Sequence, residues 1–513
     1  MSRAAGGSWR QSALALVALL AIGASLWQLL AARGGVTTQA LRIEGIPATV
    51  FRPAAGAPAP VVVIAHGFAG SQQLMQSFAL ALAQGGYVAV TFDFAGHGRN
   101  PAPLTGSITE VSGATRTLVA ETATVAAFAR GLGDGRLAVL GHSMASDIIV
   151  RFAQETPDVA ATIAVSMFSP AVTADSPRNL LVIVGDWEGM LKTEALRVVG
   201  MRSAPDAPQA GVTYGDPLQG TARRTAFSPQ VEHVGVLYSR DSLRESLQWL
   251  DTSFAIQRTD SPVPIARGGW ILLLLAGVVL LARPLSTLLP IVASTPVGAG
   301  LSWRRLWPAL LIPMLATPLL LRVLPTHFLP VLVGDYLAAH FAMYGLLTAA
   351  CLLWQRSHRA PGAGARTNRP ALMAAALALI AFGFIGIVWP INAFVTAFVP
   401  GPERIVLVLA MLVGTLAFFL SDELLTRGSG AARGAYVASK FAFVISLGIA
   451  VALDFERLFF LLIIVPVIVL FFIVYGLFSA WAYRRTNHPW VAGIANAVAF
   501  AWAIGVTFPL LAG

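Results

Sequence analysis

Charged residues and cysteine are scarce in this chain of 513 residues. Only 12% of the residues are charged and 56% are hydrophobic, whereas soluble proteins average about 25% charged and 45–50% apolar residues. This scarcity excludes a disordered chain and an ordinary soluble protein, so the composition predicts a polytopic membrane protein. The single cysteine, Cys351, lies inside an apolar run, which excludes a disulfide framework and a cysteine-based metal site.

The distribution of charge gives no indication of a nucleic-acid partner. The formal net charge is +10, but residues 36–260 hold 16 basic and 19 acidic side chains, so the positive excess belongs to the apolar remainder. There it is typical of a membrane topology signal, and no basic helix with interleaved aromatic residues is evident. The sequence also contains no recognisable metal cluster, nucleotide loop or cofactor motif, so we expect neither a metal nor a cofactor.

Long uncharged apolar runs are abundant outside residues 36–260. The first, 12–32, is flanked by basic residues and is long enough for a membrane helix of about 20 residues. A cleavable signal peptide is the alternative, but the run exceeds the usual apolar region of about 7–15 residues, so residues 1–35 are interpreted as an uncleaved signal anchor. Residues 261–513 are predicted to form a transmembrane domain of about eight helices. The candidate spans are 269–282, 306–324, 330–354, 371–391, 404–421, 437–453, 457–480 and 489–511.

Two of these candidates leave the span count open. The segment 269–282 is short, and 306–324 carries three prolines, so either could be re-entrant. Nine spans are favoured and eight are the alternative. With a cytoplasmic N-terminus, 14 Lys and Arg residues fall in the inner segments and only 5 in the outer flanks. We therefore predict a multi-pass protein of the plasma (inner) membrane with residues 36–260 on its extracytoplasmic side.

Residues 36–260 alternate short β-branched runs with helical stretches. This alternation is typical of a mostly parallel sheet with crossover helices, that is, an α/β fold. Helices are expected near 72–84, 114–130, 144–155, 191–199 and 241–256. Strands are expected at 41–44, 49–52, 61–65, 88–92, 137–140, 162–166, 180–184 and near 225–231.

The strongest chemical motif is Gly-His-Ser-Met-Ala at 141–145, which directly follows an expected strand. A serine on a sharp strand-to-helix turn has its hydroxyl pushed out of the sheet, and the turn closes only with small residues two positions before and after it. Gly141 and Ala145 meet that requirement. Ser143 is therefore a candidate nucleophile, and a helix N-cap serine is the alternative interpretation.

Two further turns follow expected strands upstream. Residues 66–70, His-Gly-Phe-Ala-Gly, can aim a backbone N–H at a developing oxyanion, and Phe68 and Met144 are the predicted pair of donors. The second turn, Asp-Phe-Ala-Gly-His-Gly at 93–98, is Gly-rich. Asp93 and His97 are expected to be structural there, because the acid and the histidine of such a site follow the serine in the chain.

Taken together, these three motifs resemble the α/β-hydrolase superfamily over roughly residues 40–256. Each motif stands at a strand end in the order typical of that family, and Ala145 replaces the more common glycine. The resemblance implies an α/β-hydrolase domain with a serine-hydrolase activity, fused to an all-α polytopic membrane domain. It does not identify a substrate.

The resemblance also implies an acid after the strand 180–184 and a histidine after the last strand. Glu188, three residues after Gly185, is the favoured acid, and Asp186 is the alternative. The implied base is His233, which would take the Ser143 proton and later protonate the leaving group while the acid holds its tautomer. The implied chemistry is acyl transfer through a covalent acyl-Ser143.

The expected substrate pocket is open, because only residues 167–179 lie where many relatives insert a helical cap. Three functions follow. The first is a membrane-embedded serine esterase that acts on a small-molecule or lipid ester among membrane lipids. The second is an acyltransferase with the same triad, and the third is a transporter or scaffold with a non-catalytic hydrolase-like binding domain. The oligomeric state is not predicted.

The acidic residues of the membrane half form no recognisable transport motif. Asp422 and Glu423 stand at the end of a candidate span, where we expect them to be solvated.

Overall fold

The computed structural model describes residues 2–54, 56, 58–107, 110–258, 264–357 and 366–512. They form two compact units. The α/β unit comprises Gly23–Leu274, Ile391–Phe398 and Pro509–Gly513, and the helical unit comprises Met1–Ile22, Leu275–Pro390 and Val399–Phe508. The predicted domain boundary at 260/261 lies outside the described residues.

The α/β unit is built on one nine-stranded sheet in the order β1-β2-β4-β3-β5-β6-β7-β9-β8. The strands from β4 to β9 in this order are parallel, whereas β1, β2 and β8 pair antiparallel with their neighbours. The strands are β1 (Val36–Ile43), β2 (Ile46–Pro53), β3 (Val61–Ala65), β4 (Val88–Phe92), β5 (Leu137–His142), β6 (Val159–Val165), β7 (Leu180–Gly185), β8 (Thr213–Tyr214) and β9 (Arg223–Ser228).

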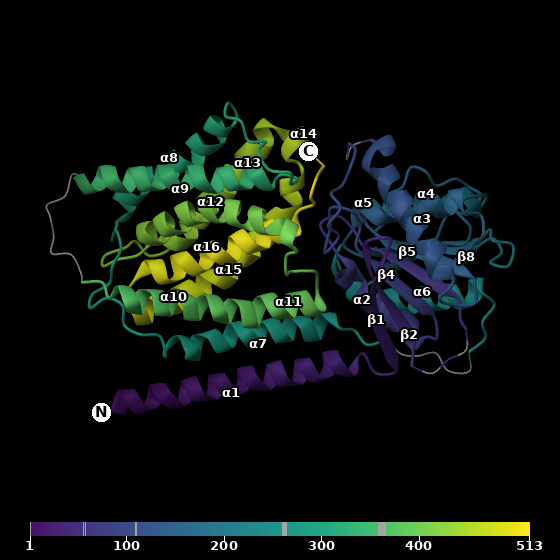
Figure 1. The fold of residues 1–513 in the computed structure, drawn as a ribbon, viewed down its shortest axis with the longest axis horizontal. Helices are drawn as coiled ribbons and strands as arrows, with labels where there is room; N and C mark the ends of the chain where they lie inside the picture. Colours follow the sequence, from purple (N-terminus) through teal and green to yellow (C-terminus); the bar gives the residue numbers. More distant parts are fainter. Residues whose placement is uncertain are drawn as a thin grey trace. The chain divides into compact units, whose positions relative to one another are not determined.

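Helices cover both faces of this sheet (Figure 1). In β3, Val61 and Val63 pack in one core with α3 and α4, while Val62 and Ile64 pack in a second core with α2 and α6. This strict alternation follows from the two-residue period of a strand. The elements are η1 (Gln72–Met75), α2 (Gln76–Gln84), η2 (Val111–Thr115), α3 (Arg116–Arg130), α4 (Met144–Glu155), α5 (Gly189–Ser203), η3 (Gly235–Tyr238) and α6 (Arg240–Ser253).

The helical unit is a bundle in which α12 contacts both α9 and α16 (Figure 1). Helices α1 and α7 each begin in one unit and end in the other. The helices are α1 (Ser2–Ala31), α7 (Gly268–Ser286), α8 (Trp303–Leu321), α9 (Gly334–Ser357), α10 (Arg369–Gly383), η4 (Phe384–Val388), α11 (Trp389–Phe394), α12 (Pro402–Thr426), α13 (Ala435–Leu453), α14 (Phe455–Leu458), α15 (Phe460–Thr486) and α16 (Pro489–Thr507).

Eight helices in the described part of the chain are long and apolar enough to cross a membrane. Several such helices indicate a multi-pass membrane protein. The favoured count of nine included α8, which is a continuous helix despite its three prolines but is not among the eight. The predicted fold class is confirmed: a mostly parallel α/β sheet accompanied by a helical region with candidate membrane spans. Strand β8 was not predicted, because its two residues lie inside a loop rich in Pro, Gly and Asp.

The expectation that Asp422 and Glu423 are solvated is wrong. They are 2% and 0% exposed, because α13 and α15 cover this end of α12. Lys440 donates to Asp422, while Arg427 and Ser479 donate to Glu423 over 3.1 and 2.6 Å. Two adjacent carboxylates are therefore buried inside the helical unit, each in a salt bridge with its own cationic side chain.

Candidate active site

Ser143 occupies the sharp turn between β5 and α4. Its backbone lies at φ 54°, ψ −118°, a conformation that L-residues rarely adopt. The turn closes so tightly that a Cβ atom on Gly141 would lie 2.6 Å from the carbonyl oxygen of Ala145. The small residues at 141 and 145 are thus required by the backbone, and the serine hydroxyl stands at the carboxyl end of the sheet.

Two side chains from later parts of the chain form a hydrogen-bonded series with this serine: a histidine contacts the serine, and a glutamate contacts the histidine. His233, on the segment between β9 and η3, places Nε2 2.8 Å from Ser143 Oγ. Its Nδ1 lies 2.6 Å from Oε1 of Glu188, which precedes α5. Since Nδ1–H donates to the carboxylate, Nε2 is left to accept the serine proton.

Glu188 is held by more than the histidine. Its Oε2 accepts the Ser166 hydroxyl at 2.8 Å and the Gly185 N–H at 2.6 Å. Burial alone would raise the pKa of Glu188, but the hydrogen bonds from His233, Ser166 and Gly185 outweigh it and lower that pKa. The carboxylate is therefore ionised and fixed in orientation.

The alternative acid, Asp186, makes different contacts. Its carboxylate pairs with Lys192 at 2.6 Å on the surface. The structure thus brings Glu188, and not Asp186, to the imidazole of His233.

The predicted oxyanion donors lie on two segments that meet at Ser143. Met144 is the first residue of α4, so its N–H has no acceptor within the helix. Phe68 follows Gly67, and a Cβ atom on Gly67 would lie 3.1 Å from Ser143 Cβ. The turn at 66–70 is thus packed directly against the serine.

Two buried histidines hold the surrounding loops. His142 Nε2 lies 2.9 Å from the carbonyl oxygen of His233, so the imidazole next to the nucleophile in sequence anchors the segment of the base. His66 contacts the Gly67 carbonyl through Nδ1 and receives the N–H of Phe94 at Nε2. Desolvation lowers the pKa of His142 to about 3 and that of His66 to about 4, which keeps both rings neutral.

Asp93 closes the second Gly-rich turn. Its carboxylate accepts the N–H of Gln72 at 2.7 Å and the N–H of Arg99 at 3.1 Å. Burial raises the pKa of Asp93, although these hydrogen bonds oppose the shift. His97 contacts the Ala95 carbonyl within the same turn, so both residues bind backbone and not the serine.

Two segments distant in sequence also bind these turns within the α/β unit. Ser71 Oγ, directly after the 66–70 turn, accepts the N–H of Ala397 at 2.8 Å and lies 2.9 Å from Thr396 Oγ1. Leu510 donates its backbone N–H to the Gly96 carbonyl and accepts the N–H of Leu104. The turns on both sides of the site are therefore fastened by residues 391–398 and 509–512.

Sequence reasoning selected Ser143, His233 and Glu188 but missed the supporting roles of Ser166 and His142. Their positions in the motifs were visible, at a strand end and beside the nucleophile, but their partners lie 22 and 91 residues away. Within the described residues no group of three or more His, Cys, Asp or Glu side chains could hold a metal ion.

Comparison with known proteins agrees with this fold. Residues 56–208 match the family model described as serine aminopeptidase, S33, and the chain thus contains an α/β-hydrolase domain, which suggests a hydrolase. No curated protein sequence matches the chain.

Three solved structures illustrate what the chain is similar to. The epoxide hydrolase VrEH1 from Vigna radiata is 25% identical over 26% of this chain and 40% of its own length, with a TM-score of 0.22. The protein TT1662 from Thermus thermophilus is 18% identical over 42% of this chain and 97% of its own, with a TM-score of 0.31. A predicted CIB-like hydrolase from Thermoplasma acidophilum is 14% identical over 43% and 98%, with a TM-score of 0.33.

Proposed function

We propose that this protein is a membrane-embedded serine hydrolase that cleaves a carboxylic ester through an acyl-Ser143 intermediate. The proposal rests on one observation, the continuous hydrogen-bonded series from Glu188 through His233 to Ser143, with separations of 2.6 and 2.8 Å. A nucleophile, a base and a carboxylate that orients the base are what acyl transfer to a serine requires.

The reaction proceeds in two balanced halves. His233 Nε2 removes the proton of Ser143 as Oγ attacks the ester carbonyl, and the N–H groups of Phe68 and Met144 stabilise the oxyanion. The tetrahedral intermediate collapses, and His233 returns the proton to the departing alcohol. His233 then deprotonates a water molecule that attacks the acyl group, which releases the acid and restores the Ser143 hydroxyl.

The surroundings of the triad favour an apolar acyl group. The described residues between β6 and β7 include no helix, and the His233 side chain is 45% exposed, so the site has no helical cap there. Phe168, Trp187 and Met190 are 65%, 67% and 87% exposed, and each lies within two residues of Ser166 or Glu188 in the chain. Large exposed apolar side chains beside an open nucleophile suit an ester with a long hydrocarbon chain.

The test is covalent labelling of the detergent-purified full chain by a fluorophosphonate probe. We expect the wild type to be labelled and Ser143→Ala and His233→Ala to lose labelling. A folded wild type that is not labelled would contradict the proposal and would favour a transporter or scaffold with a non-catalytic hydrolase-like domain.

The substrate class is tested separately with p-nitrophenyl esters of increasing chain length and with peptidyl p-nitroanilides. We expect hydrolysis of esters with a preference for long chains. Faster cleavage of the anilides would make the enzyme a peptidase, and acylation that is released only by added alcohols would make it an acyltransferase.

We further propose that the α/β-hydrolase domain, residues 36–260, is extracytoplasmic, that residues 1–35 are a signal anchor and that residues 261–513 form the transmembrane domain. The excess of Lys and Arg in the inner segments supports this orientation. In a Cys351→Ser background, a membrane-impermeant maleimide should label Gln209→Cys in intact cells and Ser429→Cys only after permeabilisation. The reverse pattern would invert the topology.

A further inference from the structure

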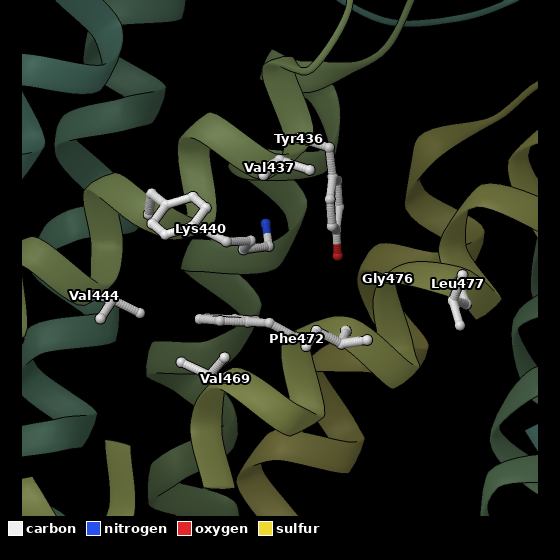
Figure 2. A pocket seen from close by; sticks show the side chains of 10 residues that line it. Tyr436, Val437, Lys440, Val444, Val469, Phe472, Gly476 and Leu477 are labelled. Atoms are coloured by element: carbon white, nitrogen blue, oxygen red, sulfur yellow. The ribbon is translucent and has the colours of Figure 1, made fainter. Parts of the chain in front are cut away.

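The helical unit contains an apolar groove of about 420 Å³ between α13 and α15. Figure 2 shows the Tyr436 ring and the Lys440 side chain entering it from α13 and Phe472 entering from α15. The helices run antiparallel, since Tyr436 lies opposite Gly476 and Val444 shares the groove with Val469. From Tyr436 to Val444 the groove is about 12 Å long, at about 1.5 Å per helical residue.

The positive charge inside the groove is already compensated. Lys440 donates to Asp422, whose other oxygen accepts the Ser439 hydroxyl. The Lys440 ammonium also lies 4.1 Å from the centre of the Tyr436 ring and 5.4 Å from that of Phe472. Lys440 therefore contributes its alkyl stem to the wall, and its charge is not available to a ligand.

The Tyr436 hydroxyl, in contrast, is buried without a hydrogen-bond partner in the described part of the chain. The ring stands in space left by Gly476, where a Cβ atom would approach Tyr436 Cε1 to 2.9 Å and its hydroxyl to 3.3 Å. A buried hydroxyl that makes no hydrogen bond is costly. An acceptor oxygen from a molecule in the groove would satisfy it.

Two exposed arginines, Arg433 and Arg484, lie beyond the Tyr436 end of the groove. Arg427 stacks on the rings of both Tyr436 and Tyr483, at 4.9 and 5.3 Å, which places Tyr483 at this end. Arg484 follows Tyr483, and Arg433 precedes Tyr436 by three residues. Neither Arg433 nor Arg484 is in a salt bridge with a side chain that the structure describes, whereas Arg427 is paired with Glu423.

We propose that this groove binds one acyl chain of an anionic phospholipid. The apolar walls take the hydrocarbon, the Tyr436 hydroxyl donates to the ester carbonyl oxygen, and Arg433 and Arg484 bind the phosphate. The order of these groups along the groove matches the order of chain, ester and phosphate in a phospholipid. The two cationic side chains select an anionic headgroup over a zwitterionic one.

The test is native mass spectrometry of the full chain, stripped of lipid in detergent and titrated with phosphatidylglycerol or with phosphatidylcholine of identical acyl chains. At about fivefold per arginine, we expect one phosphatidylglycerol to be retained about 25-fold more strongly. Arg433→Gln/Arg484→Gln should abolish this preference, whereas the exposed pair Arg304→Gln/Arg305→Gln should leave it unchanged. Equal retention of the two lipids by the wild type would overturn the proposal, as would an unchanged preference in Arg433→Gln/Arg484→Gln.

The groove itself is tested by filling it. Val469→Phe should lose retention of both lipids, while Val467→Phe, on the same helix but outside the groove, should bind as the wild type does. Thermal unfolding midpoints check that both variants are folded. Equal binding by two folded variants would show that the lipid lies elsewhere and would overturn the proposal.

Discussion

Each unit contains a hydrogen-bond network built on buried carboxylate groups, one in the α/β unit and two in the helical unit, and the two networks end differently. In the α/β unit, the Glu188 carboxylate accepts hydrogen bonds from Ser166, Gly185 and His233. His233 in turn contacts the hydroxyl of the partly exposed Ser143. In the helical unit, Asp422 and Glu423 are buried, and their partners lie on α13, on α15 and at Arg427, which directly follows α12. One network is open to a substrate, whereas the other connects three helices.

The difference teaches what a buried carboxylate indicates. Desolvation opposes the burial of all three carboxylates, and hydrogen bonds compensate for it in both networks. What separates a reactive group from a structural one is the last member of the series. A hydroxyl at a strained turn, with a base on one side and backbone donors beside it, can react, whereas an ammonium enclosed by aromatic rings cannot.

The largest expected effect is on the reactivity of Ser143, through the series from Glu188 to His233. Glu188→Gln should lower the rate of fluorophosphonate labelling by about 10³–10⁴-fold, because the amide no longer stabilises the correct tautomer and the imidazolium. Labelling rates measured under pseudo-first-order conditions check this prediction.

The control is Asp186→Asn, which removes only a surface pair with Lys192 and should change the rate less than about twofold. A larger loss in Asp186→Asn than in Glu188→Gln would transfer the role of the acid to Asp186.

Changes in the network around Asp422 and Glu423 should alter the stability of the helical unit and not the rate at which Ser143 is labelled. Lys440→Met leaves Asp422 buried without its cation and should cost about 3–5 kcal/mol of unfolding free energy in the helical unit. The labelling rate of Ser143 should stay near that of the wild type at temperatures where the variant is folded. The measurement is thermal unfolding of each unit, monitored by the protease resistance of peptides that belong to that unit.

The companion variant Asp422→Asn/Lys440→Met removes both charges and should recover much of the loss. If the single and double variants were equally stable, the pair would have no structural role.

Acid should destabilise the α/β unit through its neutral histidines. In the folded state the pKa of His66 is lowered to about 4 and that of His142 to about 3, while unfolded histidine binds a proton below about pH 6.5. The unfolded state thus gains protons first as the pH falls, so stability is lost from about pH 6.5 downward. At pH 5 each histidine should cost about 2 kcal/mol.

Thermal unfolding at pH 7 and pH 5 tests this, because His66→Asn should reduce the pH dependence of the α/β unit by about 2 kcal/mol. The same dependence in wild type and variant would mean that His66 does not carry the effect.

The smallest expected effect concerns the turn that carries Phe68. Ser71→Ala removes the acceptor of the Ala397 N–H and should slow labelling about fivefold, since a net hydrogen bond is worth about 1 kcal/mol. Thr396→Val should act in the same direction and lower kcat more than it raises KM.

Thr105→Val is the matched control, because its hydroxyl lies 3.0 Å from the Thr117 hydroxyl on the surface, away from Ser71 and Ala397 in the sequence. A loss in Thr105→Val as large as in Ser71→Ala would show a general effect of hydroxyl removal.

The sequence was informative where chemistry depends on local geometry. A nucleophile elbow, a Gly-rich turn and an acid after a strand are encoded within a few residues, so the fold class and the residues Ser143, Glu188 and His233 could be predicted. The burial of Asp422 could not, because it depends on the packing of α13 and α15 over the end of α12. The contacts of Ser71 with Thr396 and Ala397 span 325 and 326 residues, and no local pattern marks such a pair.

The discontinuity of the α/β unit sets the order of its biosynthesis. Its main part is complete at Leu274, but residues 391–398 and 509–512, which fasten the turns beside Ser143, are made only with the membrane helices. At about 5–20 residues per second, the 234 residues between Leu274 and Pro509 take a ribosome about 10–50 s. The main part of the α/β unit is therefore synthesised well before the turns beside Ser143 can acquire these partners, so those turns reach their final contacts only when the last residues of the chain have been made.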